Sequence, residues 1–302
     1  MTLETTRISL ANGVTLKVAQ GGPAEAEAII LLHGFPESHR TWRHVAPALA
    51  EEYRVLAPDQ RGFGASDKPV GVEKYRADET VGDLLALADA YGLQRFTLVG
   101  HDWGGAISWA AALKHADRLN RLVIINAPHP WIFQRSVIDD REQRAASQYI
   151  RTFRSPMMEK TIDAMGLDTF FEKTFAGHVD LAEIPDEERR AYLDDWKREG
   201  ALTAMLNWYR ASNIVVPATD EGEPRPAWAR SPFPRVTVPT LVVWGMRDKA
   251  LLPLQLDGLN MLVDDLEVVR VEDAGHFIPW ERPEPVVAAI RQFMKRGQAP
   301  ST

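Results

Sequence analysis

Short apolar runs alternate with helical patterns along the first part of the chain. Residues 7–19 alternate between apolar and polar positions around Asn12-Gly13, which predicts a β-hairpin. Residues 28–32 are continuously apolar, which is typical of a strand buried on both faces. Alternating strands and helices at this spacing predict an α/β domain with a mostly parallel sheet. Further strands are expected at 53–57, 95–99 and 122–125, and helices at 41–51, 78–91 and 104–115.

The pattern changes after residue 130. Strand-like runs disappear, and helical patterns rich in aromatic and charged residues end in a proline-rich stretch around Pro232. We therefore predict a core domain of residues 1–130 and 236–302, with a helical lid, or cap, domain of residues 131–235 inserted into it. In the second part of the core, strands are expected at 239–245 and 266–271, and helices near 253–263 and 284–295.

Composition and charge narrow the class of protein. The 302 residues are 45% hydrophobic, which is enough for one large domain with an insertion. The formal net charge of -7 argues against a nucleic-acid partner, because phosphate binding needs a basic face. The absence of cysteine excludes disulfides, cysteine-ligated zinc and thiol catalysis. No signal peptide and no apolar run of about 18 residues is visible, so we expect a cytoplasmic protein without a membrane span.

The segment Gly100-His101-Asp102-Trp103-Gly104 lies between a predicted strand and a predicted helix. This arrangement is typical of a nucleophile elbow, with aspartate where serine is usual. A carboxylate attacks acyl carbon poorly, but it can displace a leaving group from a saturated carbon and become an ester itself. Asp102 therefore favours the opening of a C–O or C–halogen bond. The alternative is that Asp102 only caps the following helix.

Polar residues also follow other predicted strands at the carboxyl edge of the sheet, where sites of open α/β sheets gather. Asp102, Asp248 and His276 follow one another in the order nucleophile, acid, histidine of an α/β-hydrolase triad. In that triad His276 is the general base and Asp248 orients its imidazole. The backbone N–H groups of Phe35 and Trp103 would form the oxyanion hole. Taken singly, Asp248 could be a turn residue and His276 an ordinary loop histidine.

These residues resemble the α/β-hydrolase-fold epoxide hydrolases, relatives of the haloalkane dehalogenases. The resemblance implies an eight-stranded, mostly parallel sheet flanked by helices, with an inserted helical lid. It also implies that Asp102 forms a covalent ester with an epoxide, that His276 activates the water that hydrolyses this ester, and that no metal or other cofactor takes part. The matching segments are His33-Gly34-Phe35-Pro36-Glu37, Gly100-His101-Asp102-Trp103-Gly104-Gly105, Asn126-Ala127-Pro128-His129-Pro130 and Gly275-His276-Phe277.

The same resemblance points to two lid tyrosines that donate hydrogen bonds to the opening epoxide oxygen. The family places one before a Phe-x-x-Pro element and the other in Asn-Trp-Tyr-Arg, and Tyr149 and Tyr209 occupy these positions. Trp103, Phe35 and Trp208 are expected to line the site for an apolar epoxide and water. Met157 replaces a glycine common in the family, which leaves the register of the first tyrosine open.

Two other functions remain open from the residues. A haloalkane dehalogenase would use the same nucleophile, and the Trp103 indole could donate to a halide. Dehalogenases usually have a second halide donor, and they carry asparagine where this chain has Phe35. A non-catalytic small-molecule receptor on the same fold would bind epoxides without turning them over.

Overall fold

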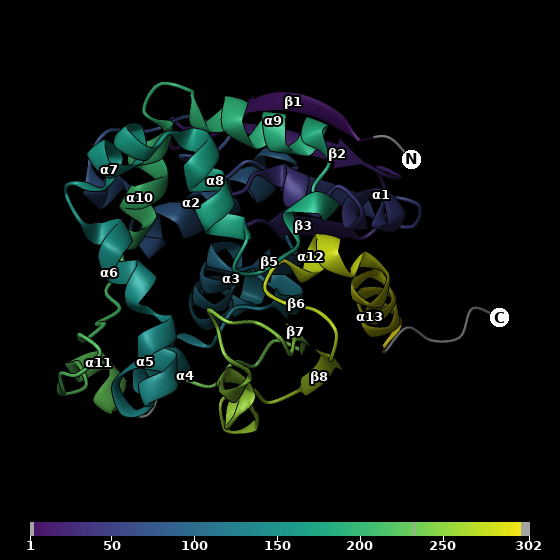
Figure 1. Cartoon of the computed structure of the whole chain (residues 1–302). Helices are drawn as coiled ribbons and strands as arrows, with labels where there is room; N and C mark the ends of the chain where they lie inside the picture. The colour runs from purple at the N-terminus through teal and green to yellow at the C-terminus, as the bar shows by residue number, and fades with distance from the viewer. Residues whose placement is uncertain (1–2, 232, 297–302) are drawn as a thin grey trace.

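An eight-stranded sheet forms the centre of the molecule (Figure 1), in the strand order β1-β2-β4-β3-β5-β6-β7-β8. The computed structural model describes residues 3–231 and 233–296; Met1, Thr2 and Pro232 lie outside the described residues. The pairs β1–β2 and β2–β4 are antiparallel, and the other five strand pairs are parallel. This confirms the predicted, mostly parallel sheet. The strands are β1 (Glu4–Ser9), β2 (Thr15–Gly21), β3 (Ala28–Leu32), β4 (Arg54–Pro58), β5 (Phe96–His101), β6 (Leu119–Ile125), β7 (Thr240–Gly245) and β8 (Leu266–Val271).

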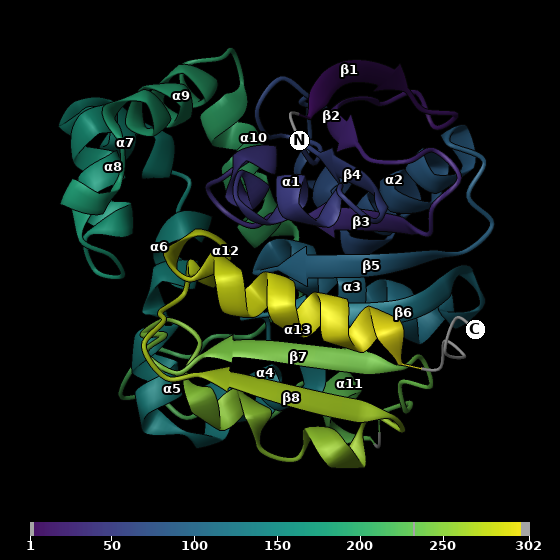
Figure 2. The ribbon, with the colours of Figure 1, turned by 90° about the vertical axis from the view of Figure 1, so that its right-hand side faces the viewer.

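Helices cover both faces of the sheet because its central strands are apolar on both sides. In β3 every residue is buried: Ile29 and Leu31 join one hydrophobic cluster, and Ile30 and Leu32 join another on the opposite face. Figure 2 shows α13 on one face of the sheet, running in front of it between β5 and β7. The core helices are α1 (Val45–Leu49), α2 (Ala77–Ala90), α3 (Trp103–Lys114), α12 (Ile278–Glu281) and α13 (Pro283–Lys295).

The described residues between β6 and β7 form helices and loops but no strand, as the sequence pattern predicts. We call residues 130–230 the helical insertion. Figure 2 shows part of it beyond the arrowheads of the strands, where the carboxyl ends of the parallel strands meet. None of the helices in residues 3–231 and 233–296 has the length and apolar character needed to cross a bilayer. The insertion comprises α4 (Pro130–Asp139), α5 (Arg141–Ala146), α6 (Gln148–Arg154), α7 (Met158–Met165), α8 (Leu167–Phe175), α9 (Asp186–Trp196), α10 (Ala201–Ala211) and α11 (Ala227–Arg230).

Two predicted helices differ in the structure. The expected helix at 41–51 is a 3-10 turn (His39–Trp42) followed by the short α1. Pro47 explains the break, because proline has no N–H and its ring clashes with the carbonyl four residues earlier in a continuous helix. The prediction of a helix near 253–263 is wrong: two 3-10 turns occur there, separated by Gly258 at φ 85°, a left-handed conformation that interrupts a helix.

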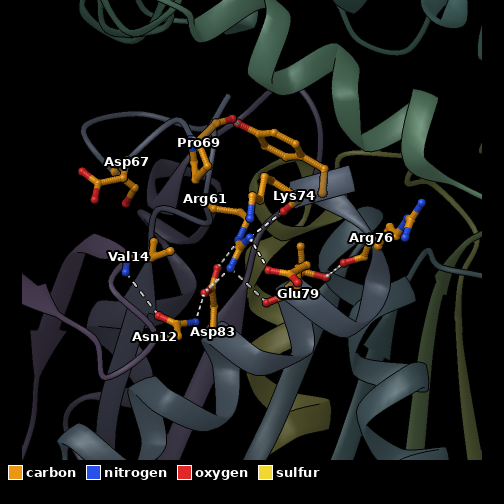
Figure 3. A network of polar contacts seen from close by, with 12 residues as sticks. Asn12, Val14, Arg61, Asp67, Pro69, Lys74, Arg76, Glu79 and Asp83 are labelled. Carbon is orange, nitrogen blue, oxygen red and sulfur yellow. Dashed lines mark hydrogen bonds and ion pairs between the residues drawn. The ribbon is translucent and has the colours of Figure 1, made fainter. Parts of the chain in front are cut away.

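A buried polar network centred on Arg61 joins the loop after β4 to neighbouring elements (Figure 3). The Arg61 guanidinium donates to both carboxylate oxygens of Asp83 on α2, and to the backbone carbonyls of Lys74 and Glu79. Asn12, in the β1–β2 hairpin, donates to the same Asp83 at 2.7 Å. The hairpin, the β4 loop and α2 are thus held together beneath the helical insertion.

Candidate active site

Asp102 occupies the tight turn between β5 and α3. Its backbone adopts φ 51° and ψ −119°, a conformation that non-glycine residues rarely adopt and that is typical of strained functional turns. Glycine is required beside it: a Cβ atom at Gly104 would overlap the carbonyl of Leu32, and one at Gly34 would overlap Asp102 itself. Although Asp102 precedes α3, its side chain makes no capping hydrogen bond to that helix. Its carboxyl group instead lines a cavity.

The structure brings Asp102, His276 and Asp248 together. His276 Nε2 lies 3.7 Å from Asp102 Oδ2, and His276 Nδ1 donates to Asp248 Oδ2 at 2.7 Å. Asn126 Nδ2 donates to the same Asp248 oxygen at 2.7 Å. The other oxygen accepts from the backbone N–H of Leu251 at 2.9 Å. Asp248 is therefore fixed from several sides and in turn fixes the imidazole.

Charge and burial shift the pKa values of these three groups in opposite directions. Burial alone would lower the pKa of His276, but the charge and hydrogen bond of Asp248, together with the charge of Asp102, raise it to about 9. Burial alone would raise the pKa of Asp248, yet His276 and the other donors hold it below its usual value. Burial raises the pKa of Asp102, against the opposing effect of His276 and of two backbone N–H groups. The triad thus combines the protonated imidazole of His276 with the carboxyl groups of Asp102 and Asp248.

Those two backbone N–H groups belong to Phe35 and Trp103. The Phe35 N–H donates to Asp102 Oδ1 at 2.7 Å, and the Trp103 N–H contributes to lowering the pKa of the same carboxyl group. Asp102 Oδ1 is therefore held by the Phe35 amide, whereas Oδ2 faces His276. Donors in this position stabilise negative charge that develops on the oxygen they bind.

Tyr149 on α6 and Tyr209 on α10 face the same carboxylate from the helical insertion. Their ring centroids are 6.1 Å apart. Burial raises the pKa of both phenols well above the ordinary value, and the charge of Asp102 acts in the same direction. Both hydroxyls therefore stay protonated at neutral pH and can donate hydrogen bonds.

Two cavities meet at these side chains. The larger has a volume of about 520 Å³ and is lined by Phe35, Asp102, Tyr149, Tyr209 and His276, among others. The smaller, about 70 Å³, also contains Asp102, Tyr149 and Tyr209 in its lining. Trp103 lines the smaller cavity and Phe35 the larger. Ligand sites commonly combine such an apolar cavity with a few convergent polar groups.

Trp208 lies elsewhere than expected. It lines neither of these cavities, and its indole N–H donates to the Arg61 carbonyl at 3.1 Å. Its ring packs against Trp103 with centroids 5.9 Å apart. Adjacent residues on a helix point about 100° apart, so when Tyr209 faces the cavity its neighbour faces the core. Trp208 thus supports the site from behind.

Asn126 and His178 also belong to the site, but their places in it were not predicted from the sequence. Asn126 directly follows β6 at φ 39°, a conformation that asparagine tolerates better than most residues, and binds Asp248. Its place in a matched segment was the one available signal. His178 lines the larger cavity with its ring centroid 5.6 Å from that of His276, and nothing in the local sequence distinguishes it. Within residues 3–231 and 233–296, no group of three or more acidic or histidine side chains is arranged to hold a metal ion.

Comparison with known proteins agrees with this geometry. Residues 27–283 match the family described as the alpha/beta hydrolase fold. The AB hydrolase superfamily protein YfhM of Bacillus subtilis (strain 168) is 34% identical, over 94% of this chain and 96% of its own length. Epoxide hydrolase A of Mycobacterium tuberculosis is 32% identical, over 96% of this chain and 97% of its own length.

Solved structures show the same relationship. An epoxide hydrolase from metagenomes of hot environments superimposes with a TM-score of 0.90 at 46% identity, covering 99% of this chain and 100% of that chain. An epoxide hydrolase of Bacillus megaterium, solved as the M145A mutant, gives a TM-score of 0.83 at 27% identity, with 96% and 100% covered. The chain therefore belongs to the α/β-hydrolase superfamily, among the epoxide hydrolases of that fold.

Proposed function

We propose that the protein converts an apolar epoxide and water into a vicinal diol, using Asp102 as the nucleophile. The observation that carries this proposal is the placement of one carboxylate between amide donors, an imidazole and two protonated phenols. A nucleophile, a base and two acids then surround one point in a cavity, which is the set that epoxide opening and ester hydrolysis require. The names of the relatives support the same activity.

In the first step, Asp102 Oδ2 attacks one carbon of the epoxide ring. A carbon–oxygen bond forms to Asp102 as the ring carbon–oxygen bond breaks. The departing oxygen receives hydrogen bonds from Tyr149 and Tyr209 and takes a proton from one of them. An alkoxide is a stronger base than a phenolate, so this transfer is favourable and a proton from water later restores the tyrosine.

In the second step, the loss of charge on Asp102 changes His276. Ester formation removes the negative charge of Asp102, one of those that raise the pKa of the imidazole, so His276 gives up its proton more readily. The neutral imidazole takes a proton from water, whose oxygen attacks Cγ of Asp102. The Phe35 and Trp103 N–H groups stabilise the oxyanion on Oδ1. The tetrahedral intermediate then breaks its bond to the diol oxygen, which takes the proton from His276, so the diol is released. The second proton of the attacking water leaves the new carboxyl group, which restores the carboxylate of Asp102, and returns to the tyrosine that gave up its proton in the first step.

The geometry also supports a role for residues 131–235 as the lid of this site. The insertion contributes both phenols, whereas the core contributes the nucleophile and the base. A site assembled from two such parts excludes bulk water once both are in place. We therefore assign the lid the acid function and the core the nucleophilic function.

The mechanism is tested by trapping its intermediate. We expect His276→Gln to open the epoxide but not to hydrolyse the ester, so intact-protein mass spectrometry should show a mass increase equal to one epoxide molecule. Asp102→Asn should show no adduct and no turnover. A His276→Gln protein that stays unmodified with every reactive epoxide would contradict the ester mechanism.

A substrate panel separates this activity from the alternatives. Purified protein is incubated with aryl and alkyl epoxides and with haloalkanes, and the diol and the released halide are measured. Diol formation is expected. Halide release without diol would indicate a dehalogenase, and binding of epoxides without any product would indicate a receptor.

A further inference from the structure

The larger cavity differs in chemistry between its two ends. Around Asp102 its walls are aromatic, with Phe35, Phe153 and Tyr209 in contact with one another. Two lysines, Lys173 and Lys249, also belong to its lining, and both are exposed to solvent. They therefore lie at the outer end of the cavity. An apolar passage leads from a cationic mouth to the nucleophile.

The two lysines come from different parts of the molecule. Lys173 lies on α8 of the helical insertion, and Lys249 follows Asp248 in the core. Lys249 Nζ donates to the carbonyl of Gly177 at 3.0 Å, in the turn after α8, which holds its ammonium group close to the helix that bears Lys173. The mouth thus has a cationic group on each side, one of them anchored by a hydrogen bond.

Nothing on the cavity wall near the mouth neutralises these charges. Among the described residues that line this cavity, Asp102 is the sole carboxylate, and it lies at the reaction centre. In the described part of the chain, Lys114 and Lys197 pair with aspartates, whereas neither Lys173 nor Lys249 forms an ion pair. This contrasts with the molecule as a whole, which has 42 acidic and 35 basic residues.

His178 adds an uncharged polar group to the same wall. It lies in the turn after α8, and its Nδ1 is buried without a hydrogen-bond partner among the described residues. A buried polar nitrogen without a partner is costly unless a ligand or water satisfies it. The groups around the ring are His276, Phe277, Asp248 and Lys249, and none of them bonds this nitrogen. The outer part of the cavity therefore offers positive charge and a free hydrogen-bonding atom.

We propose that the enzyme acts on epoxides that carry a carboxylate on one arm, with Lys173 and Lys249 binding the carboxylate while the oxirane reaches Asp102. This inference rests on the proposed function. The hydrocarbon part of the arm would occupy the aromatic passage, where burial of apolar surface is favourable. Because the lysines act far from the reacting atoms and equally on substrate and transition state, they are expected to lower KM and to leave kcat unaltered.

The test compares substrates that differ only in this charge. We use ω-epoxyalkanoates of increasing chain length (an oxirane at one end of a saturated chain and a carboxylate at the other) and the corresponding primary amides. The wild-type enzyme should show a higher kcat/KM for the acid at the best chain length, by about fivefold for each lysine. The preference should appear in KM and should weaken at high ionic strength, since these charges are exposed to solvent.

Variants then assign the preference to the lysines. Lys173→Met combined with Lys249→Met should bring the acid-to-amide ratio of kcat/KM close to one, and Lys249→Glu should reverse it. Lys197→Met is the matched control, because Lys197 is an exposed lysine of the insertion that pairs with Asp194 and lines neither cavity. That variant should keep the wild-type ratio.

The outcomes separate this inference from the function on which it rests. Turnover of acids and amides without a preference, or a preference that survives the double substitution, would overturn the inference alone. A neutral aryl epoxide is included in every assay. If it, the acids and the amides all remain unhydrolysed by folded protein, the proposed epoxide hydrolase function fails and the inference fails with it.

Discussion

Tyr149 and Tyr209 are phenols whose burial raises their pKa and so strengthens their hold on the proton. An exposed phenol already stays protonated at neutral pH, but these two are enclosed beside a carboxylate, which raises their pKa further. They are therefore donors that do not compete with Asp102 for negative charge. In the proposed mechanism they act in the first step alone, because the second step uses a base and an oxyanion hole rather than an acid.

The assignment of Tyr149 and Tyr209 to the first step leads to a prediction. Tyr149→Phe combined with Tyr209→Phe should slow epoxide opening by at least about 100-fold, since general acid catalysis contributes that much or more. Single-turnover kinetics, following the mass of the covalent adduct in a His276→Gln background, measure this step directly. Tyr91→Phe is the control, because its hydroxyl binds Gln20 outside both cavities. A double variant that alkylates at the full rate would contradict the assignment.

The pKa of His276 predicts how the rate of ester hydrolysis, the second step of the proposed mechanism, depends on pH. In the free enzyme its pKa is about 9, partly because of the charge on Asp102. The ester carries no charge, so the pKa in the intermediate must lie below that value. The rate of ester hydrolysis should therefore rise with pH and level off below pH 9. Pre-steady-state decay of the adduct, measured from about pH 6 to 10, tests this expectation; a rate that falls over this range would exclude His276 as the base.

At the level of elements, the nucleophile elbow was predictable because its causes are local. A buried strand, a tight turn and a helix follow each other directly, and close packing leaves no room for a side chain at Gly104. The orientation of α10 was not predictable in the same way. This helix is buried around most of its circumference, so hydrophobicity could not decide whether Trp208 or Tyr209 faces the cavity.

Other parts of the site depend on contacts between distant segments. Asn126 follows β6 and donates a hydrogen bond to Asp248 after β7. No pattern in the sequence around either residue predicts this contact. His178 reaches the cavity only because the turn after α8 packs over His276. The order of Asp102, Asp248 and His276 along the chain was sufficient to predict that they lie together, because they follow β5, β7 and β8, whose carboxyl ends share one edge of the sheet. Residues supplied by the insertion have no such constraint.

The Arg61 network gives a prediction for the elements it joins. The side chains of Arg61 and Asp83 are 2% and 7% exposed, so Arg61→Ala would leave a buried carboxylate without its partner (Figure 3). We expect a loss of about 3 to 5 kcal/mol in the free energy of unfolding. The control is Arg235→Ala at the exposed pair with Asp264, which should cost less than about 1 kcal/mol. Urea unfolding compares them, and equal effects would contradict a structural role for the network.

At the scale of the whole molecule, the insertion and the core are joined by buried hydrogen bonds. The Tyr192 hydroxyl on α9 donates to Glu37 at 2.7 Å, and the Trp196 indole donates to the carbonyl of Pro36 at 2.9 Å. Both acceptors precede the 3-10 turn that begins at His39 and follow closely after Phe35, whose N–H donates to Asp102. Displacement of the insertion would therefore disturb this contact to Asp102 as well as the phenols.

Buried histidines set the pH at which the molecule is most stable. Burial is the largest cause that lowers the pKa of His33 and His178 to about 4, and of His101 and His129 to about 3. An unfolded histidine titrates near pH 6.5, so below that pH the unfolded chain binds protons that the folded chain does not. The stability these residues contribute is complete above about pH 6.5 and is lost as the pH falls toward 4.

His276 has the opposite effect, because its pKa is raised to about 9. Its contribution is complete below about pH 6.5 and is lost as the pH rises through 9. The raised pKa of buried Glu37 offsets part of the acid loss, since the folded chain retains that proton. The pKa of His44 is lowered as well, so five histidines act on the acid side and His276 acts on the alkaline side. Stability should therefore be greatest near pH 6.5, with the steeper fall on the acid side.

Urea-unfolding free energies measured from about pH 4.5 to 9.5 should show this maximum. His129→Gln should reduce the acid slope by about 1.4 kcal/mol per pH unit, the value for one proton. It is the appropriate variant because burial is the sole cause of the shift at His129, which lies outside the triad. His276→Gln should flatten the alkaline side, and it should also reduce the acid slope because the charge of His276 contributes to the lowered pKa of His101 and His178. Parallel curves for wild type and His129→Gln would show that this histidine is already charged in the folded protein, and the burial argument would then fail for it.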